Sequence, residues 1–191
     1  EFKVSYYEAK NYQIIRNIAS EVVKLSLNIT TLLRYPLFLF SSKKCAVHTS
    51  NNFGPTGKFD YRVGDVVTAL IKDRVPLIFL IRTIHGPLKI IKNHFLREVP
   101  CIYTDSIIKV CELIARCNPL LIAGKNNLQG DLKYHVVFDR LSHGLSGIRL
   151  SIRTLGFIFQ KTNTSVMFCA DSSERSILDL AACKQRGIAT I

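Results

Sequence analysis

Apolar residues recur along this chain with two periods, and the two periods alternate towards its C-terminus. Residues 166–170 form a short apolar run, which is typical of a buried strand. Apolar residues then recur at helical spacing from Ile177 to Ala182, Gly187 provides a helix stop, and residues 188–191 are again short and β-prone. Strand, helix and strand in this order predict a βαβ unit and therefore a parallel sheet.

The same alternation continues upstream. Residues 148–152 place Ile148, Leu150 and Ile152 on one side and Arg149 with Arg153 on the other, which predicts a strand with one basic face. An apolar run that ends just before Gly124 predicts a further buried strand. We expect an α/β fold with a parallel sheet containing 119–123, 148–152, 166–170 and 188–191, and with helices over 105–117, 128–142 and 173–186.

The first third of the chain has a different character. Apolar residues at helical spacing predict a helix over 12–27, and the segment 35–40 is expected to be extended. Residues 41–64 are rich in Ser, Asn, Gly and Lys, which is typical of a linker. We therefore expect an N-terminal extension and linker over 1–64 and an α/β core over 65–191.

Charge adds the first indication of function. The 191 residues contain 26 Lys and Arg against 14 Asp and Glu, a formal net charge of +12. So basic a protein predicts an anionic partner, either nucleic acid or a membrane surface. No apolar run approaches the roughly 18 residues that a membrane-spanning helix needs.

The cysteines indicate neither disulfides nor a metal. None of the six has Cys-x-x-Cys spacing, so we expect reduced, buried thiols in an intracellular protein. Cys45 and His48 are spaced like half of a zinc site, but no second half is evident. No metal and no cofactor are expected.

Candidate contacts to RNA come from cations without acidic neighbours. The stretch 82–97 contains four basic residues and no acid, and Lys125 follows the expected strand 119–123. Basic side chains in such a pattern can each reach a different phosphate, although a solvated basic face remains the alternative. The expected RNA-binding residues are Arg82, Lys89, Lys92, Arg97, Lys125, Arg149 and Arg153.

Several segments resemble one family in the same order. Residues 105–117 followed by Pro119-Leu-Leu-Ile-Ala-Gly-Lys125 resemble the helix and the Ile-Leu-Phe-Val-Gly-Thr-Lys strand of the S-two family of small-subunit ribosomal proteins. Arg153-Thr-Leu-Gly156 is similar to that family's Arg-Trp-Leu-Gly-Gly segment. Met167-Phe-Cys-Ala-Asp171 and residues 188–191 are similar to its Leu-Phe-Val-Val-Asp and Ile-Pro-Val-Val strands. The resemblance covers about residues 80–191.

The chain also departs from that family. Thr154 stands in place of the Trp and Phe157 in place of the second Gly, and the bacterial coiled-coil insertion after Gly156 is missing. Such drift is typical of an organellar member. The resemblance implies a three-layer, flavodoxin-like core without enzymatic activity, which binds rRNA and neighbouring proteins in the small subunit of a mitochondrial ribosome. It implies a location in the mitochondrial matrix, no membrane partner and no small-molecule substrate.

Two other functions compete with this one. An α/β enzyme that binds a nucleotide or phosphate would place its pocket near 124–127 and 171–173, at the carboxyl ends of strands. The chain has no Gly-x-Gly-x-x-Gly or Walker sequence, and Asp171 is expected to cap a helix rather than act as an acid. A basic protein could also dock on a membrane through residues 12–40.

Overall fold

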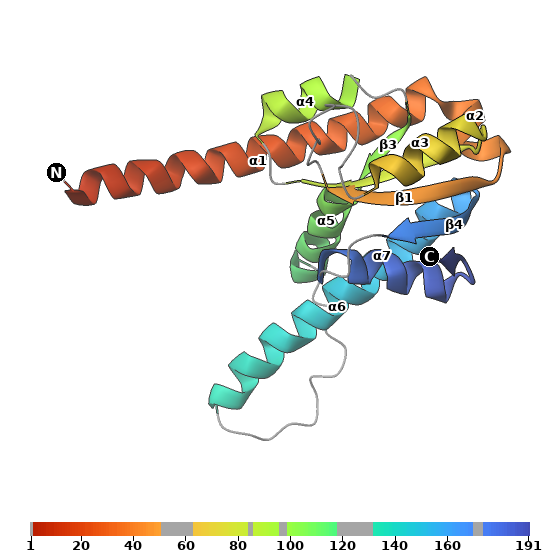
Figure 1. The fold of residues 1–191 in the computed structure, drawn as a ribbon. Helices are drawn as coiled ribbons and strands as arrows, with labels where there is room; N and C mark the ends of the chain where they lie inside the picture. Colours follow the sequence, from red (N-terminus) through yellow and green to blue (C-terminus); the bar gives the residue numbers. More distant parts are fainter. Residues whose placement is uncertain (1, 51–62, 84–85, 96–98, 118–131, 170–173) are drawn as a thin grey trace.

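A computed structural model describes residues 2–50, 63–83, 86–95, 99–117, 132–169 and 174–191. Its centre is a five-stranded, all-parallel sheet with the order β3-β2-β1-β4-β5 (Figure 1). This is a doubly wound order: the chain adds β2 and β3 on one side of β1 and then adds β4 and β5 on its other side. The strands are β1 (Lys44–Ser50), β2 (Leu77–Arg82), β3 (Cys101–Tyr103), β4 (Thr164–Cys169) and β5 (Ala189–Thr190).

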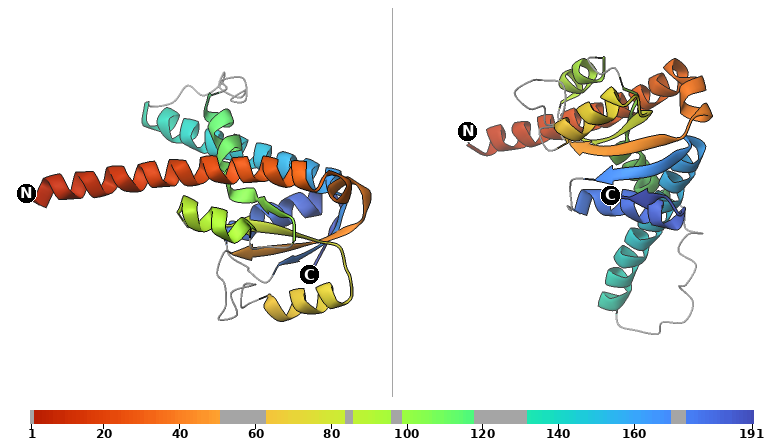
Figure 2. Two further views of the ribbon diagram at one scale, coloured as in Figure 1. Left: turned by 90° about the horizontal axis from the view of Figure 1, so that it is seen from above. Right: turned by 45° about the vertical axis from the view of Figure 1, so that its right-hand side comes forward.

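Helices cover both faces of the sheet, so that the fold has three layers, as in flavodoxin-like proteins (Figures 1 and 2). One outer layer contains α1 (Phe2–Arg34), α3 (Gly64–Lys72) and α4 (Pro87–Phe95). The other contains α5 (Thr104–Cys117), α6 (Leu132–Lys161) and α7 (Glu174–Gln185). A short helix, α2 (Pro36–Ser41), connects α1 to β1.

The two hydrophobic cores follow from alternation along the strands. In β2 the side chains of Ile78 and Leu80 pack beneath α5, α6 and α7, whereas Phe79 and Ile81 pack beneath α1, α3 and α4. All six residues of β2 are buried. A continuous apolar run is what a parallel strand with both faces covered requires.

A buried lysine organises the amino end of β1. Lys44 is 1% exposed, and its ammonium group donates hydrogen bonds to the carbonyl oxygens of Leu39, Ser42 and Thr162, at 3.0, 2.6 and 3.1 Å. Burial lowers the pKa of this amine from its ordinary value. The cation neutralises carbonyls at the C-terminal ends of α2 and α6, where unpaired C=O groups carry partial negative charge.

Helix α1 covers the edge of the sheet at β3. The side-chain amide of Asn28 donates to the carbonyl oxygen of Tyr103 at 3.2 Å and accepts from the Tyr103 amide at 2.7 Å. The Thr31 hydroxyl donates to the carbonyl oxygen of Cys101 at 2.9 Å. Side chains of α1 thus satisfy backbone groups that an edge strand would otherwise leave open. The first half of α1 projects beyond the other elements in both views (Figures 1 and 2).

The parallel sheet and the helices flanking it are confirmed. β4 and β5 pair in parallel and are joined by α7, as expected for the βαβ unit, and α5 occupies the range expected for it. The expected helix over 12–27 is part of the longer α1. The expected strand 119–123 lies outside the described residues, as does the start of the expected helix 128–142.

Three expectations were wrong. Residues 148–152 lie within α6, because Ser151, Leu155 and Phe159 are buried at helical spacing and the period-two alternation is incidental. Residues 35–40 are not extended: Pro36 begins α2, a position that suits proline. The expected linker 41–64 contains β1, the central strand of the sheet.

The helices also bear on membrane association. Among the described residues, no helix combines the length and the apolar character that crossing a membrane requires.

The backbone conformations of Gly144 and Gly187 predict opposite effects when each is replaced by alanine. Gly144 lies inside α6, where an added methyl group would meet only open space, whereas Gly187 has φ +66° after α7. Gly144→Ala should raise the free energy of unfolding by about 0.5–1 kcal/mol through helix propensity. Gly187→Ala should lower it by roughly 1 kcal/mol through left-handed strain. Urea denaturation measures both, and a destabilised Gly144→Ala would argue against a continuous α6.

Candidate nucleic-acid interface

Four of the expected RNA-binding residues are exposed, but they form two separate surfaces. Lys89 and Lys92 are exposed on α4, and Arg149 with Arg153 on α6. A spacing of three or four residues places each pair on one side of its helix. Because α4 and α6 cover opposite faces of the sheet, the structure does not bring the two pairs together (Figure 1). Arg97 and Lys125 lie outside the described residues.

Arg186 extends the α6 surface onto α7's C-terminal turn. Gly156 lies one helical turn after Arg153 and is buried, and a Cβ placed on it would approach Nε of Arg186 to 3.1 Å. The absence of a side chain at Gly156 therefore lets the Arg186 side chain pack against α6 one helical turn beyond Arg153. Arg186 is itself exposed.

Arg82 was expected to bind RNA, but the structure shows that its side chain is buried. It is 8% exposed, its Nη2 lies 3.1 Å from Oδ2 of Asp179, and its Nε donates to Oγ1 of Thr104 at 3.3 Å. Its side chain shares the face of β2 that Ile78 and Leu80 use, so it points beneath α7 rather than towards solvent. The stretch 82–97 contains no acidic residue, but α7 supplies Asp179 as a partner for Arg82. Arg82 is therefore not available to a phosphate.

Asp179 is the partner that holds Arg82 inside. Its side chain is fully buried on α7, and Nε2 of His48 on β1 lies 3.5 Å from the same carboxylate oxygen. Burial raises the pKa of Asp179 to about 6, against the opposing effect of the Arg82 charge, while Asp105 adds a smaller increase. At neutral pH the carboxylate is ionised, so the group joins β1, β2 and α7 electrostatically.

A second buried charge cluster fixes α1 to the sheet. Lys24 is 1% exposed, and its ammonium group donates to Oδ2 of Asp105 at 2.5 Å, to Oε1 of Glu21 at 2.9 Å and to the carbonyl oxygen of Thr83 at 2.7 Å. Oδ2 of Asp105 also accepts the backbone N–H of Thr83 at 3.3 Å. Exposed Lys109 reaches Glu21 from α5 at 2.6 Å. All three donors of Lys24 are used.

These clusters segregate charge. Among the side chains whose exposure the structure describes, Glu21, Asp105 and Asp179 are drawn into internal ion pairs, and the exposed acids are Asp65, Asp73 and Glu112. The part of the surface that these side chains form is therefore distinctly cationic. The exposed cations among the same side chains are Arg16, Arg34, Lys43, Lys72, Arg74, Lys89, Lys92, Lys109, Arg116, Arg149, Arg153, Lys161, Lys184 and Arg186.

The carboxyl ends of the strands are where an enzyme of this fold would bind its ligand. The ranges expected for such a pocket, 124–127 and 171–173, lie outside the described residues, as does Asp171. Of the described residues at this edge, Arg82 and Asp105 are engaged in ion pairs within the protein, and Nε2 of His48 lies 3.5 Å from Oδ2 of Asp179. Across the described side chains, no group of three or more His, Cys, Asp or Glu residues could hold a metal ion. Cys45 and His48 are three positions apart on β1, which places them on opposite faces.

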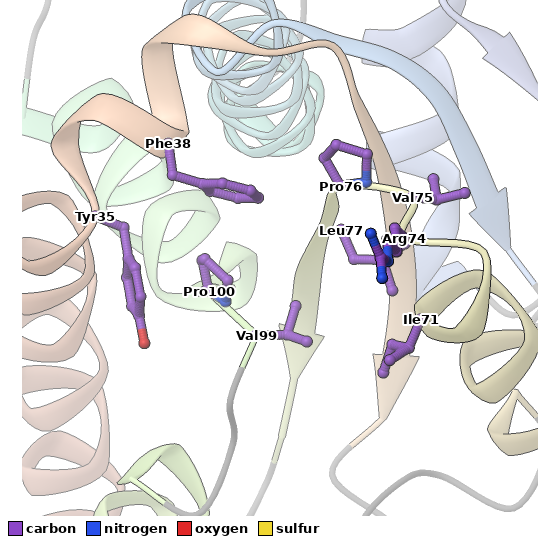
Figure 3. Close-up of a pocket in the computed structure, with 9 residues that line it drawn as sticks. All are labelled: Tyr35, Phe38, Ile71, Arg74, Val75, Pro76, Leu77, Val99 and Pro100. Atoms are coloured by element: carbon purple, nitrogen blue, oxygen red, sulfur yellow. The ribbon is translucent and has the colours of Figure 1, made fainter.

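A pocket of about 390 Å³ lies at the other edge of the sheet, at the amino ends of β2 and β3 (Figure 3). Aromatic rings from the α1–α2 junction face apolar residues before β2 and β3, and Arg74 is its charged member. It offers no converging set of polar groups for catalysis. The residues that line it are Tyr35, Phe38, Ile71, Arg74, Val75, Pro76, Leu77, Val99 and Pro100.

Comparison with known proteins adds no relative. No family model, no curated protein and no solved structure matches this chain.

Sequence reasoning missed both buried charge clusters. Asp179 had a detectable signal, because it lies three residues from Ser176 and from Ala182 on the face of α7 that is buried. Lys24 had none. The apolar stripe that predicted α1 includes Ile18 and Val22, which are 60% and 57% exposed, and the helix docks through the opposite side.

The buried position of Asp179 predicts a specific pH dependence. Its pKa is about 6 in the folded protein, above the ordinary 3.8, so the folded state binds this proton more tightly than the unfolded state. The resulting stabilisation is complete below about pH 4 and is lost as the pH rises through 6, roughly 3 kcal/mol in all. Urea denaturation of wild type and Asp179→Asn between pH 4 and 7 measures this stabilisation as the difference between their free energies of unfolding. Parallel pH profiles for the two proteins would contradict the assignment.

Two lysines that share Glu21 provide a matched pair. Lys24→Met leaves Asp105 with no cation in a mostly buried site and should lower the free energy of unfolding by about 3 kcal/mol. Lys109→Met removes a half-exposed partner of the same Glu21 and should cost less than about 1 kcal/mol. Equal losses for the two variants would show that Lys24 does not anchor α1.

Proposed function

We propose that this chain is a structural constituent of the small subunit of a mitochondrial ribosome, where it binds small-subunit rRNA and neighbouring ribosomal proteins. The observation that carries the proposal is the segregation of charge. Glu21, Asp105 and Asp179 are used inside the protein, while both outer helical layers present Lys and Arg to solvent. A cationic surface of this kind fits a polyphosphate backbone.

The two basic surfaces suit RNA that contacts the protein on more than one side. Lys89 and Lys92 lie on α4, and Arg149, Arg153 and Arg186 lie at the α6–α7 layer. Phosphate contacts from helix surfaces position a protein without reading base identity. No stacking platform is needed for such contacts, which fits a protein that packs against folded RNA.

The order of elements also supports the proposal. The part of the chain that resembles the S-two ribosomal family contains α5, α6, β4, α7 and β5, and its helices at α5 and α7 and its parallel strands β4 and β5 agree with the family's pattern. Arg153 and Gly156, which belong to the segment similar to Arg-Trp-Leu-Gly-Gly, lie inside α6, and Arg186 packs against Gly156. The expected strand before them is replaced by helix, so their role is argued here from their contacts.

The competing enzyme function finds less support among the described residues. It requires polar groups that converge on a cavity at the carboxyl ends of the strands. The described charged groups there are engaged in ion pairs, and the pocket of about 390 Å³ lies at the opposite edge.

Binding to a small-subunit rRNA fragment across a salt series tests the proposal. Lys89→Ala with Lys92→Ala, and separately Arg149→Ala with Arg153→Ala, should each flatten the log–log salt dependence by up to about 1.4–1.8, since each phosphate contact contributes about 0.7–0.9. Exposed charges contribute little to stability, so both variants should remain folded.

Controls separate specific contacts from general charge. Lys43→Ala with Lys72→Ala removes the same charge from exposed positions outside both surfaces and should alter the slope less. Co-sedimentation of the native protein with the small mitochondrial ribosomal subunit tests the assembly itself. Unchanged slopes for both pairs, together with no co-sedimentation, would refute the proposal.

A further inference from the structure

The exposed side of α1 carries a regular apolar seam. Its residues repeat at alternating intervals of three and four, the a and d positions of a heptad. Five of the six are 43–66% exposed, and Leu25 is half-buried. The seam consists of Ile15, Ile18, Val22, Leu25, Ile29 and Leu32.

The five exposed residues of the seam lie away from the surface that attaches α1 to its own domain. The helix docks through Lys24, Leu27 and Thr31, which are 1–6% exposed. At about 100° per residue, these positions and the seam are centred on opposite sides of the helix. Protein monomers rarely leave a contiguous apolar row of this length uncovered, so the seam indicates a binding surface.

The residue types along the seam indicate what covers it. Ile15, Val22 and Ile29 occupy the a positions and are all β-branched, and Leu25 and Leu32 occupy two of the three d positions. β-Branched residues at a with leucine at d favour parallel, two-stranded coiled coils. We propose that the seam pairs in parallel with the same seam of a second copy of this chain, forming a homodimer. This proposal does not depend on the ribosomal one.

The flanking positions are compatible with that pairing. Ala19 and Ser26 at the e positions are small, and Glu21 at a g position is already paired with Lys24 and Lys109. In a parallel pair, Glu21 faces Ser26 of the second copy, so no like charges meet. Because each domain docks on the side opposite the seam, the two domains lie on the outside of the pair. In the view from above, the N-terminal half of α1 extends beyond the other elements (Figure 2).

The seam is short for a coiled coil, but α1 is already folded as a helix in the single chain. Isolated helices of fewer than about 12–15 residues are marginal, because nucleation is costly. Here α1 is held as a helix by the Lys24 cluster and by Asn28 and Thr31 at β3, so association does not have to pay for helix formation.

A membrane surface fits the seam less well. Interfacial helices present many Lys and Arg residues along their polar face. The opposite face of α1 is occupied by its own domain, and the exposed cations among the described side chains of α1 are Arg16 and Arg34.

Sedimentation equilibrium of the full chain at micromolar concentration, without RNA, tests the dimer. Wild type should have twice the mass of one chain, and Ile18→Glu with Ile29→Glu should have the mass of one. Both residues are about 60% exposed in the single chain, so the variant should remain folded, as circular dichroism would verify. Leu88→Glu with Leu113→Glu, which are exposed on α4 and α5, provides the control and should remain dimeric. A monomeric or trimeric wild type would overturn the proposal.

Cross-linking tests the orientation. In a Cys117→Ser background, Val22→Cys brings identical a positions together in a parallel pair, within the reach of a disulfide, so oxidation should yield a covalent dimer. Asn17→Cys, exposed but outside the seam, should yield little. Absence of the Val22→Cys cross-link would contradict parallel pairing even if the glutamate variant failed to fold. Wild type that stays monomeric but floats with phosphatidylcholine–phosphatidylserine vesicles through Ile18 and Ile29 would assign the seam to a membrane instead.

Discussion

Buried cations that contact acidic side chains and backbone carbonyls hold the layers of this protein together. Lys24 ties α1 to Asp105 at the start of α5, Arg82 ties β2 to Asp179 on α7, and Lys44 ties the ends of α2 and α6 to β1. Removing a charge from water costs several kcal/mol per ion unless its hydrogen bonds are satisfied. Each cluster therefore tolerates few alternative arrangements, and the helical layers are fixed in place on the sheet by geometry as well as by apolar burial.

The sequence predicted what depends on local periodicity. The run before Asp171 and the amphipathic pattern that ends at Gly187 were sufficient for a parallel βαβ unit, because burial of one face leaves a direct trace in the order of residues. The prediction of a strand over 148–152 was wrong because a five-residue alternation also fits a helix. Only the continuation to Leu155 and Phe159 distinguishes helix from strand. The central strand β1 was missed because it carries Lys44, His48 and Thr49, polar residues that are buried in the folded protein, where Lys44 contacts Thr162 and His48 lies near Asp179.

The candidate interface shows the same division. Lys89, Lys92, Arg149 and Arg153 are exposed, as a surface role requires, although Arg149 and Arg153 were expected on a strand and lie on a helix. Arg82 could not be excluded from sequence, since its partner Asp179 lies in another element of the fold. Ion pairs between distant residues also explain why cations outnumber acids among the exposed side chains that the structure describes.

The pairing of Asn28 and Thr31 with β3 has a consequence for solubility. β3 has only three residues, and side chains of α1, rather than a further strand, occupy its outer backbone groups. An edge blocked in this way cannot recruit a strand from another molecule, which is the usual first step of β-sheet aggregation. Helix α1 thus covers the β3 edge of a parallel sheet, a topology that forms slowly during folding, whereas exposed β5 forms the other edge.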